Sequence, residues 1–85
     1  MAPLSIVGVR DGDRLRRPQG MHEPLRLSLS ALGGSGRRWW FLDGRPLGDT
    51  ALDAPFNHAF DSGRHQLSVL DEGGQTARLE FNVGP

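Results

Sequence analysis

Residues 39–48 read Trp-Trp-Phe-Leu-Asp-Gly-Arg-Pro-Leu-Gly, and this stretch decides the fold. Four large apolar residues run directly into Asp-Gly, a dipeptide that strongly favours a tight hairpin because both central turn positions need φ > 0. A short second run, residues 45–48, then leaves the turn. The stretch therefore predicts a β-hairpin with its turn at Asp43-Gly44.

The first strand of this hairpin is apolar on both faces. Because side chains alternate along a strand, Trp40 and Leu42 share one face while Trp39 and Phe41 share the other. Immunoglobulin-like sandwiches commonly carry a core tryptophan on their third strand, in many of them four residues before the glycine of an Asp-Gly turn, as Trp40 lies before Gly44. We therefore assign Trp40 to the core and Trp39 to the outer face.

The rest of the chain reads as a series of short strands. Helical periodicity is missing, and 12 Gly and 6 Pro interrupt the chain every eight to twelve residues, a spacing typical of all-β sandwiches. Further strands are expected at residues 4–9, 24–32, 56–60, 64–70 and 75–83, with a short continuation of the first strand from Leu15. We predict an all-β, immunoglobulin-like or fibronectin-like two-sheet sandwich of about seven antiparallel strands, without an internal repeat.

Alternation within these strands also predicts the core. The expected strands at residues 24–32 and 75–83 carry apolar residues at every second position with polar residues between them. Such residues belong to one buried face. The predicted core is Trp40, Leu42, Leu27, Leu29, Leu67, Val69, Leu79 and Phe81.

Length and charge limit what the chain does. Its 85 residues suit one domain, which buries about 60–65% of the surface of the unfolded chain and leaves no room for a deep cleft. We expect one domain over residues 3–85, with residues 1–2 a start added to an excised segment. Ten basic residues balance ten acidic ones, which argues against a nucleic-acid or membrane-surface binder. No stretch approaches the roughly 20 apolar residues of a membrane-spanning helix, and no signal-peptide core follows the start.

Lysine and cysteine are missing from the chain. All ten basic residues are arginine. A lysine base, a Schiff base and a P-loop lysine are thereby excluded from this chain, as are a disulfide, a thiolate nucleophile and a cysteine-ligated metal.

Two segments carry a family resemblance. Residues 38–44 with Pro46-Leu47-Gly48, and Gly63 with residues 65–77, closely resemble the C-terminal domain of bifunctional (class A) penicillin-binding proteins of the 1C type. Residues 6–12, with their Arg-Asp-Gly turn, resemble the start of that domain. The resemblance covers nearly the whole chain.

The resemblance implies a periplasmic, non-catalytic module at the end of an enzyme that polymerises glycan strands and cross-links their peptides. Contact with the membrane is then expected only through the anchor of that parent protein. A transpeptidase needs a Ser-x-x-Lys nucleophile and a Lys-Thr-Gly strand, and a chain without lysine contains neither. We expect no cofactor. The expected partners are the preceding transpeptidase domain of the same protein and a periplasmic protein or peptidoglycan.

Other candidate sites are weaker. The three histidines, His22, His58 and His65, lack the spacing of zinc ligands, and acidic residues in turns serve the local backbone more often than Ca²⁺. A catalytic triad written from Asp61, Ser62 and His65 is not expected, because these neighbours point in different directions. We therefore expect no metal and no catalytic residue.

Arg37, Trp39 and Phe41 form the strongest candidate contact site. Arginine beside exposed aromatics suits a protein contact, a sugar ring under an indole, or a single-stranded nucleic acid, and zero net charge weakens the last. Arginine stems that merely cover neighbouring core residues are the purely structural alternative. A carbohydrate-binding or adhesion module that contacts glycan through Trp39 is therefore the alternative function.

Overall fold

The computed structural model describes residues 2–17, 20 and 22–84, and these form eight β-strands and no helix. Pro18 and Gln19, which follow the continuation expected from Leu15, lie outside the described residues. None of the described segments is a helix long and apolar enough to cross a membrane. The strands are β1 Ser5–Val7, β2 Arg14–Arg16, β3 Leu25–Leu32, β4 Arg38–Leu42, β5 Arg45–Thr50, β6 Phe56–Phe60, β7 Gly63–Asp71 and β8 Thr76–Gly84.

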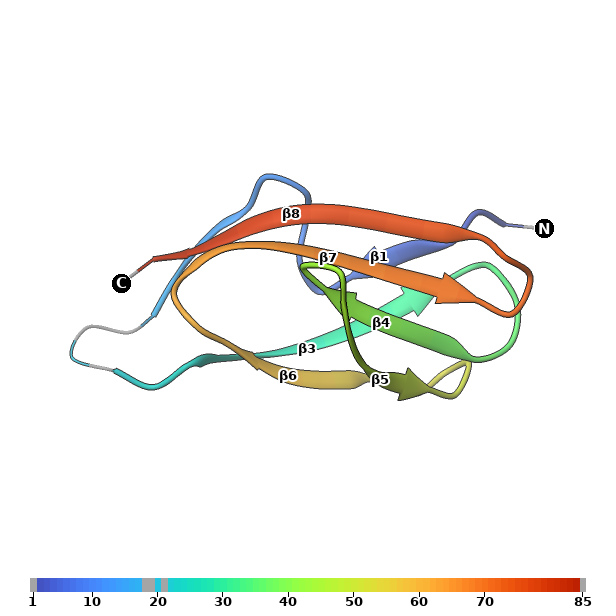
Figure 1. Cartoon of the computed structure of the whole chain (residues 1–85), viewed down its shortest axis with the longest axis horizontal. Helices are drawn as coiled ribbons and strands as arrows, with labels where there is room; N and C mark the ends of the chain where they lie inside the picture. The colour runs from blue at the N-terminus through green and yellow to red at the C-terminus, as the bar shows by residue number, and fades with distance from the viewer. Residues whose placement is uncertain (1, 18–19, 21, 85) are drawn as a thin grey trace.

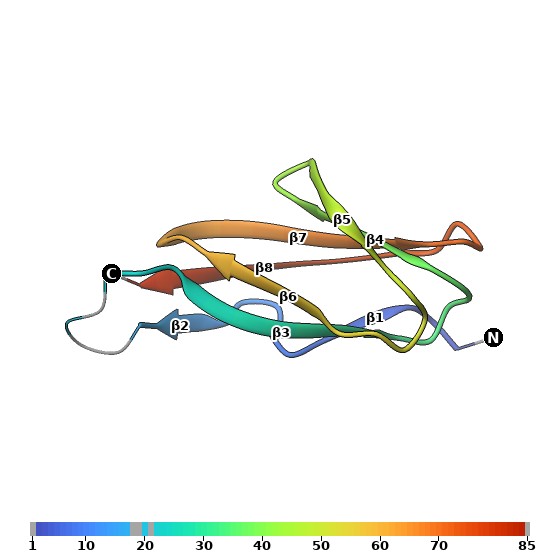
Figure 2. The same cartoon turned by 90° about the horizontal axis from the view of Figure 1, so that it is seen from below.

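The strands form two layers. One sheet has the order β1-β3-β6 and the other the order β2-β8-β7-β4-β5, and Figure 2 shows the two sheets lying over one another. The two ends of the chain lie at opposite ends of the long axis (Figure 1). The predicted all-β two-sheet sandwich is confirmed, and the strand order is consistent with an immunoglobulin-like arrangement.

One pairing differs from the prediction. β2 runs parallel to β8, with Arg14 opposite Asn82 and Arg16 opposite Gly84, whereas we expected antiparallel strands throughout. The reason is that the first expected strand is split in two. β1 pairs with β3 in one sheet, the chain then crosses to the other sheet through a turn closed by the Asp13 N–H and the Arg10 carbonyl, and β2 begins there. This split also makes the strand count eight instead of about seven.

The core lies between the sheets and is built as alternation requires. Leu27 and Leu42, which we expected in the core, are half-buried and pack against it. The other expected residues are buried, with Trp40, Leu29, Leu67 and Val69 fully inaccessible. Among the described residues, the buried apolar side chains are Leu4, Val9, Leu29, Ala31, Trp40, Phe60, Leu67, Val69, Leu79, Phe81 and Val83.

The β4–β5 turn has the predicted geometry. Asp43 and Gly44 both have positive φ, 51° and 83°, as a tight hairpin of this type requires. Asp43 also fixes the turn to the neighbouring strand. Its N–H donates to the Gln66 carbonyl at 2.8 Å, and its Oδ1 accepts the Gln66 N–H at 2.9 Å.

Candidate interaction surface

The outer face of the five-stranded sheet carries three neighbouring apolar side chains. Trp39 lies opposite Leu70 of β7, and Phe41 lies opposite Ser68, two positions along the same strand. Trp39 is 36% exposed, and Phe41 and Leu70 are half-buried. We call Trp39, Phe41 and Leu70 the outer patch. Apolar side chains that gather on one surface mark contact sites more often than scattered ones do.

A shallow hollow adjoins the outer patch. It has a volume of about 230 Å³ and is lined by residues of three neighbouring strands, Phe41 of β4, Ser68, Val69 and Leu70 of β7, and Thr76, Ala77 and Arg78 of β8. Pockets for drug-sized ligands usually measure about 300–1,000 Å³, so this hollow suits a single side chain. The lining combines the apolar side chains of Phe41 and Leu70 with the polar side chains of Ser68, Thr76 and Arg78, which fits an apolar group that carries a hydrogen-bonding end.

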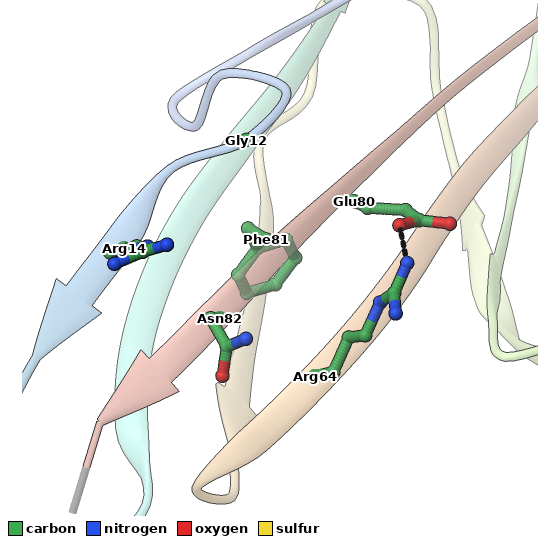
Figure 3. Close-up of a pocket in the computed structure, with 6 residues that line it drawn as sticks. All are labelled: Gly12, Arg14, Arg64, Glu80, Phe81 and Asn82. Atoms are coloured by element: carbon green, nitrogen blue, oxygen red, sulfur yellow. Dashed lines mark hydrogen bonds and ion pairs between the residues drawn. The ribbon is translucent and has the colours of Figure 1, made fainter.

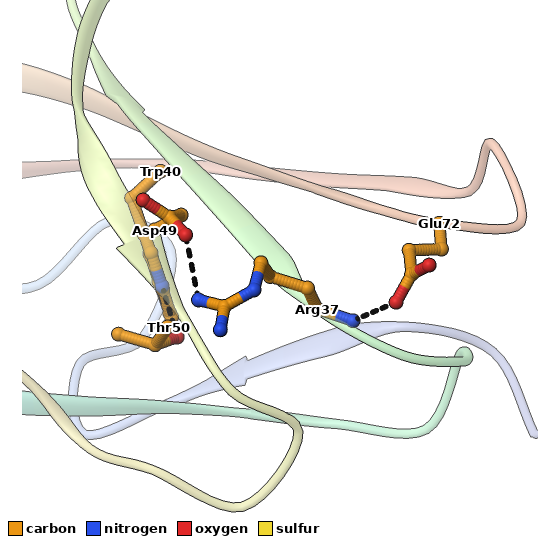
Figure 4. A network of polar contacts seen from close by, with 5 residues as sticks. All are labelled: Arg37, Trp40, Asp49, Thr50 and Glu72. Carbon is orange, nitrogen blue, oxygen red and sulfur yellow. Dashed lines mark hydrogen bonds and ion pairs between the residues drawn. The ribbon is translucent and has the colours of Figure 1, made fainter.

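Trp40 lies on the opposite face of the same strand and is fully buried. Its ring stacks on Phe56 of the other sheet, with 5.3 Å between centroids and 7° between planes. Its Nε1–H donates to Thr50 Oγ1 at 3.0 Å (Figure 4). The single polar atom of the indole therefore has a partner, and Trp40 joins the two sheets without exposing a contact surface.

Arg37 borders the outer patch and is held in place on two sides. Its Nη1 donates to Asp49 Oδ2 at 2.6 Å, and its backbone N–H donates to Glu72 Oε2 at 2.6 Å (Figure 4). Asp49 is the residue opposite Trp39 on β5. Since both side chains of the Arg37–Asp49 pair are about half exposed, the pair contributes little to stability. Its effect is to place fixed polar groups beside the Trp39 ring.

Two buried charged residues, which the sequence pattern did not predict, lie behind this surface. Arg38 and Asp71 are each only 2% exposed and lie opposite each other on β4 and β7. Arg38 Nη2 donates to the Gly33 carbonyl at 2.7 Å. Alternation along the strands already indicated that both side chains point toward the core, because Arg38 shares a face with Trp40, and Asp71 shares one with Val69. Charged residues at strand ends are usually exposed, which is why the pattern alone did not reveal the pair.

Asp71 is ionised and organises the loops at this end of the sandwich. Its Oδ2 accepts the Ser35 N–H at 2.8 Å, and its Oδ1 accepts the Gln75 N–H at 2.7 Å. Burial opposes the charge, but backbone N–H donors from Ser35, Gln75 and Gly73, together with the Arg38 guanidinium, outweigh it and lower the pKa of Asp71. One carboxylate thus fixes the loop between β3 and β4, where residues 33–36 read Gly-Gly-Ser-Gly, against the β7–β8 turn.

Comparison with known proteins identifies the family. The family model described as Penicillin-Binding Protein C-terminus Family matches residues 1–81. The chain belongs to the penicillin-binding protein C-terminus family. It is 43% identical over 79 residues to penicillin-binding protein 1C of Escherichia coli (strain K12). The match covers 93% of this chain and 10% of that relative, so the chain spans about a tenth of the length of the curated protein it matches. No solved structure matches the chain.

The predicted resemblance to penicillin-binding protein C-terminal domains is thus confirmed. The histidines of this family member lie apart from the outer patch. His58 of β6 stacks on Phe56 at 5.8 Å and meets Phe60 edge-on at 4.9 Å. His65 contacts Phe60 and also Phe81, at 5.6 and 5.5 Å. His22 is exposed. Two of the three histidines therefore belong to an aromatic row that continues the core.

The described residues assemble neither a triad of Asp61, Ser62 and His65 nor a cluster of metal ligands. His65 Nε2 bonds to the backbone carbonyl of Asp61 at 2.7 Å, not to the hydroxyl of Ser62, and both of these neighbours are exposed. Within the described ranges, no three His, Asp or Glu side chains converge as metal ligands would. We therefore take the outer patch as the candidate functional site.

Proposed function

We propose that the domain is a non-catalytic accessory module of a periplasmic peptidoglycan synthase. The observation that carries this proposal is the match of a penicillin-binding protein C-terminus model to nearly the whole chain. Because the chain corresponds to a tenth of its relative, we infer that residues 3–85 are one module of a longer protein anchored in the inner membrane. The absence of lysine and cysteine from the chain supports a role without covalent catalysis.

We further propose that the outer patch docks on the transpeptidase domain that precedes this module in the longer protein. The placement of the first described residues supports this. The Ala2 carbonyl accepts the Gly34 N–H at 2.9 Å, and the Leu4 N–H donates to Gln75 Oε1 at 3.2 Å. The chain is therefore held at the end of the sandwich where β4 begins and β7 ends, which is also where Trp39 and Leu70 lie. A domain that precedes Ala2 is within reach of the outer patch.

Binding of the separately expressed transpeptidase domain tests the docking proposal. Tryptophan is common at binding hot spots, where truncation costs about 2 kcal/mol or more, so Trp39→Ala should raise Kd by about 30-fold. Leu32→Ala is the matched control, since Leu32 is an apolar residue 58% exposed on the other sheet. Its Kd should change less than twofold. An unchanged Kd for Trp39→Ala, or an equal loss in both variants, contradicts docking through the outer patch.

Contact with glycan is the second candidate function. It is favoured by one observation, the Arg37–Asp49 pair beside the Trp39 ring, because an indole flanked by hydrogen-bonding groups suits a sugar. Titration with purified glycan strands should then change the tryptophan fluorescence, and Trp39→Phe should abolish the change while Trp40 remains buried. A change that persists in Trp39→Phe, or no change at all, contradicts this function.

A different periplasmic protein that binds through the outer patch would replace the transpeptidase domain as the partner in the docking proposal.

A further inference from the structure

A second exposed feature lies at the other end of the sandwich, where β2 pairs with β8. Leu15 packs against the core, so its neighbours Arg14 and Arg16 both face away from it, and both are exposed. Arg14 lies opposite Asn82, and Asn82 in turn lies opposite Arg64 of β7. A polar row thus crosses three strands on the outside of the sheet.

Two hollows meet along this row. The smaller one, of about 160 Å³, includes Arg14, Arg64 and Asn82 in its lining. The larger one, of about 490 Å³, is lined by Arg14, Leu15, Arg16, Asn82 and Gly84. Arg14 and Asn82 belong to both. Figure 3 shows Arg14 on β2 and Asn82 on β8, with Arg64 hydrogen-bonded to Glu80 on the far side of the row.

The arginines of this row differ in whether they are neutralised. Arg64 is paired with Glu80. Within residues 2–17, 20 and 22–84, no carboxylate pairs with Arg14 or Arg16, and no acidic residue lines the larger hollow. Asp11, in the preceding turn, uses its Oδ1 to accept the Glu80 N–H at 2.8 Å. Two guanidinium groups therefore border a hollow in which nothing described balances their charge.

The spacing of the two arginines selects a ligand of a particular shape. Residues two apart on a strand are about 6.6 Å apart, which is also the spacing of alternate side chains in an extended peptide. A guanidinium group binds a carboxylate through two parallel hydrogen bonds, and the Asn82 amide both donates and accepts, as a peptide group requires.

We propose that Arg14, Arg16 and Asn82 bind an extended acidic peptide that carries carboxylates at alternate positions. The formal net charge of the whole chain is zero, so the attraction is local to these two arginines. A short peptide with two matched carboxylates fits this arrangement better than a long polyanion, which needs a broad basic surface.

Calorimetric titration of the 85-residue chain with a synthetic peptide tests the site. The probe is acetyl-Ser-Glu-Thr-Glu-Ser-amide, and its control carries glutamine in place of both glutamates. We expect the glutamine peptide to bind at least tenfold more weakly. The double variant Arg14→Gln/Arg16→Gln should weaken binding of the acidic peptide by at least tenfold, and raising the salt from 50 to 500 mM should weaken it as well.

The matched control is Arg26→Gln/Arg45→Gln, which removes the same charge from two exposed arginines on other strands. Its affinity for the acidic peptide should change less than twofold. The proposal is overturned by equal binding of the glutamine peptide, by equal losses in the two double variants, or by no binding at millimolar peptide. It is also overturned if inorganic phosphate displaces the peptide at equal concentration, because the site would then recognise any small anion.

Discussion

Truncation of Trp40 to alanine is the perturbation that most directly probes the fold. The side chain is fully buried, and an aromatic of this size removes about 200 Å² from water, worth about 5 kcal/mol at 25 cal/mol/Å². Measured losses for Trp→Ala in cores are about 3–5 kcal/mol. A chain of 85 residues has a free energy of unfolding of roughly 4–13 kcal/mol. We therefore expect Trp40→Ala to lower Tm by about 15–30 °C or to unfold the domain.

Two companion variants separate the parts of this effect. Trp40→Phe keeps the ring that stacks on Phe56 but loses the hydrogen bond to Thr50, so its cost should be about 1–2 kcal/mol. Trp39→Ala removes a partly exposed ring and leaves no enclosed cavity, so it should cost less than half as much as Trp40→Ala. Thermal unfolding followed by circular dichroism measures all three. A Trp40→Ala protein with an unchanged Tm, or one more stable than Trp39→Ala, would refute the assignment of the two faces.

Three further outcomes are expected. The pKa of Asp71 is lowered in the folded state, so its ionised form stabilises the fold at neutral pH, and this contribution is lost as pH falls below the unfolded value of about 3.9. Asp71→Asn should therefore lower Tm at pH 7 and flatten the decline of Tm in acid; parallel Tm–pH curves would count against this role. Gly34→Ala should lower Tm more than Gly44→Ala. Both glycines have positive φ, but only at Gly34 would the new Cβ collide with Asp71 Oδ2. Equal losses of Tm would show that the structure relieves this collision. The chain should not be labelled by a fluorescent penicillin on a denaturing gel, because it has neither lysine nor cysteine and hence no Ser-x-x-Lys nucleophile; a labelled band would contradict the non-catalytic role.

Local patterns were sufficient for the parts of the fold that depend on neighbours in sequence. The Asp43-Gly44 turn and the alternation through β4 predicted a hairpin with Trp40 inside and Trp39 outside, and the structure places them so. Both features follow from steric rules that act within a few residues. The family resemblance is local in the same sense, because the segments that carry it span this hairpin and the β7–β8 turn.

Pairings between distant segments could not be predicted in this way. β2 has three residues with a single apolar side chain, so nothing local indicates whether it runs parallel or antiparallel to β8. The Arg38–Asp71 pair likewise depends on the register between β4 and β7. The outer patch was foreseen at Trp39 and Phe41 but not at Leu70, which joins them only through that register. The site at Arg14 and Arg16 could not be predicted either, because Asn82 lies beside Arg14 only through the pairing of β2 with β8.

The parallel pairing of β2 with β8 has a consequence for how the chain reaches its folded state. Arg14 and Asn82 come into contact across nearly the full length of the sequence, so this side of the sandwich closes only when the last strand is present. Contacts between segments so far apart form slowly, because the intervening chain must first be ordered. During synthesis, the early strands would leave their apolar faces exposed until β8 is complete. A chain that stops short of β8 would lose the strand that joins β2 to β7 in its larger sheet, together with the core residues of β8, and such exposed strands are prone to aggregate.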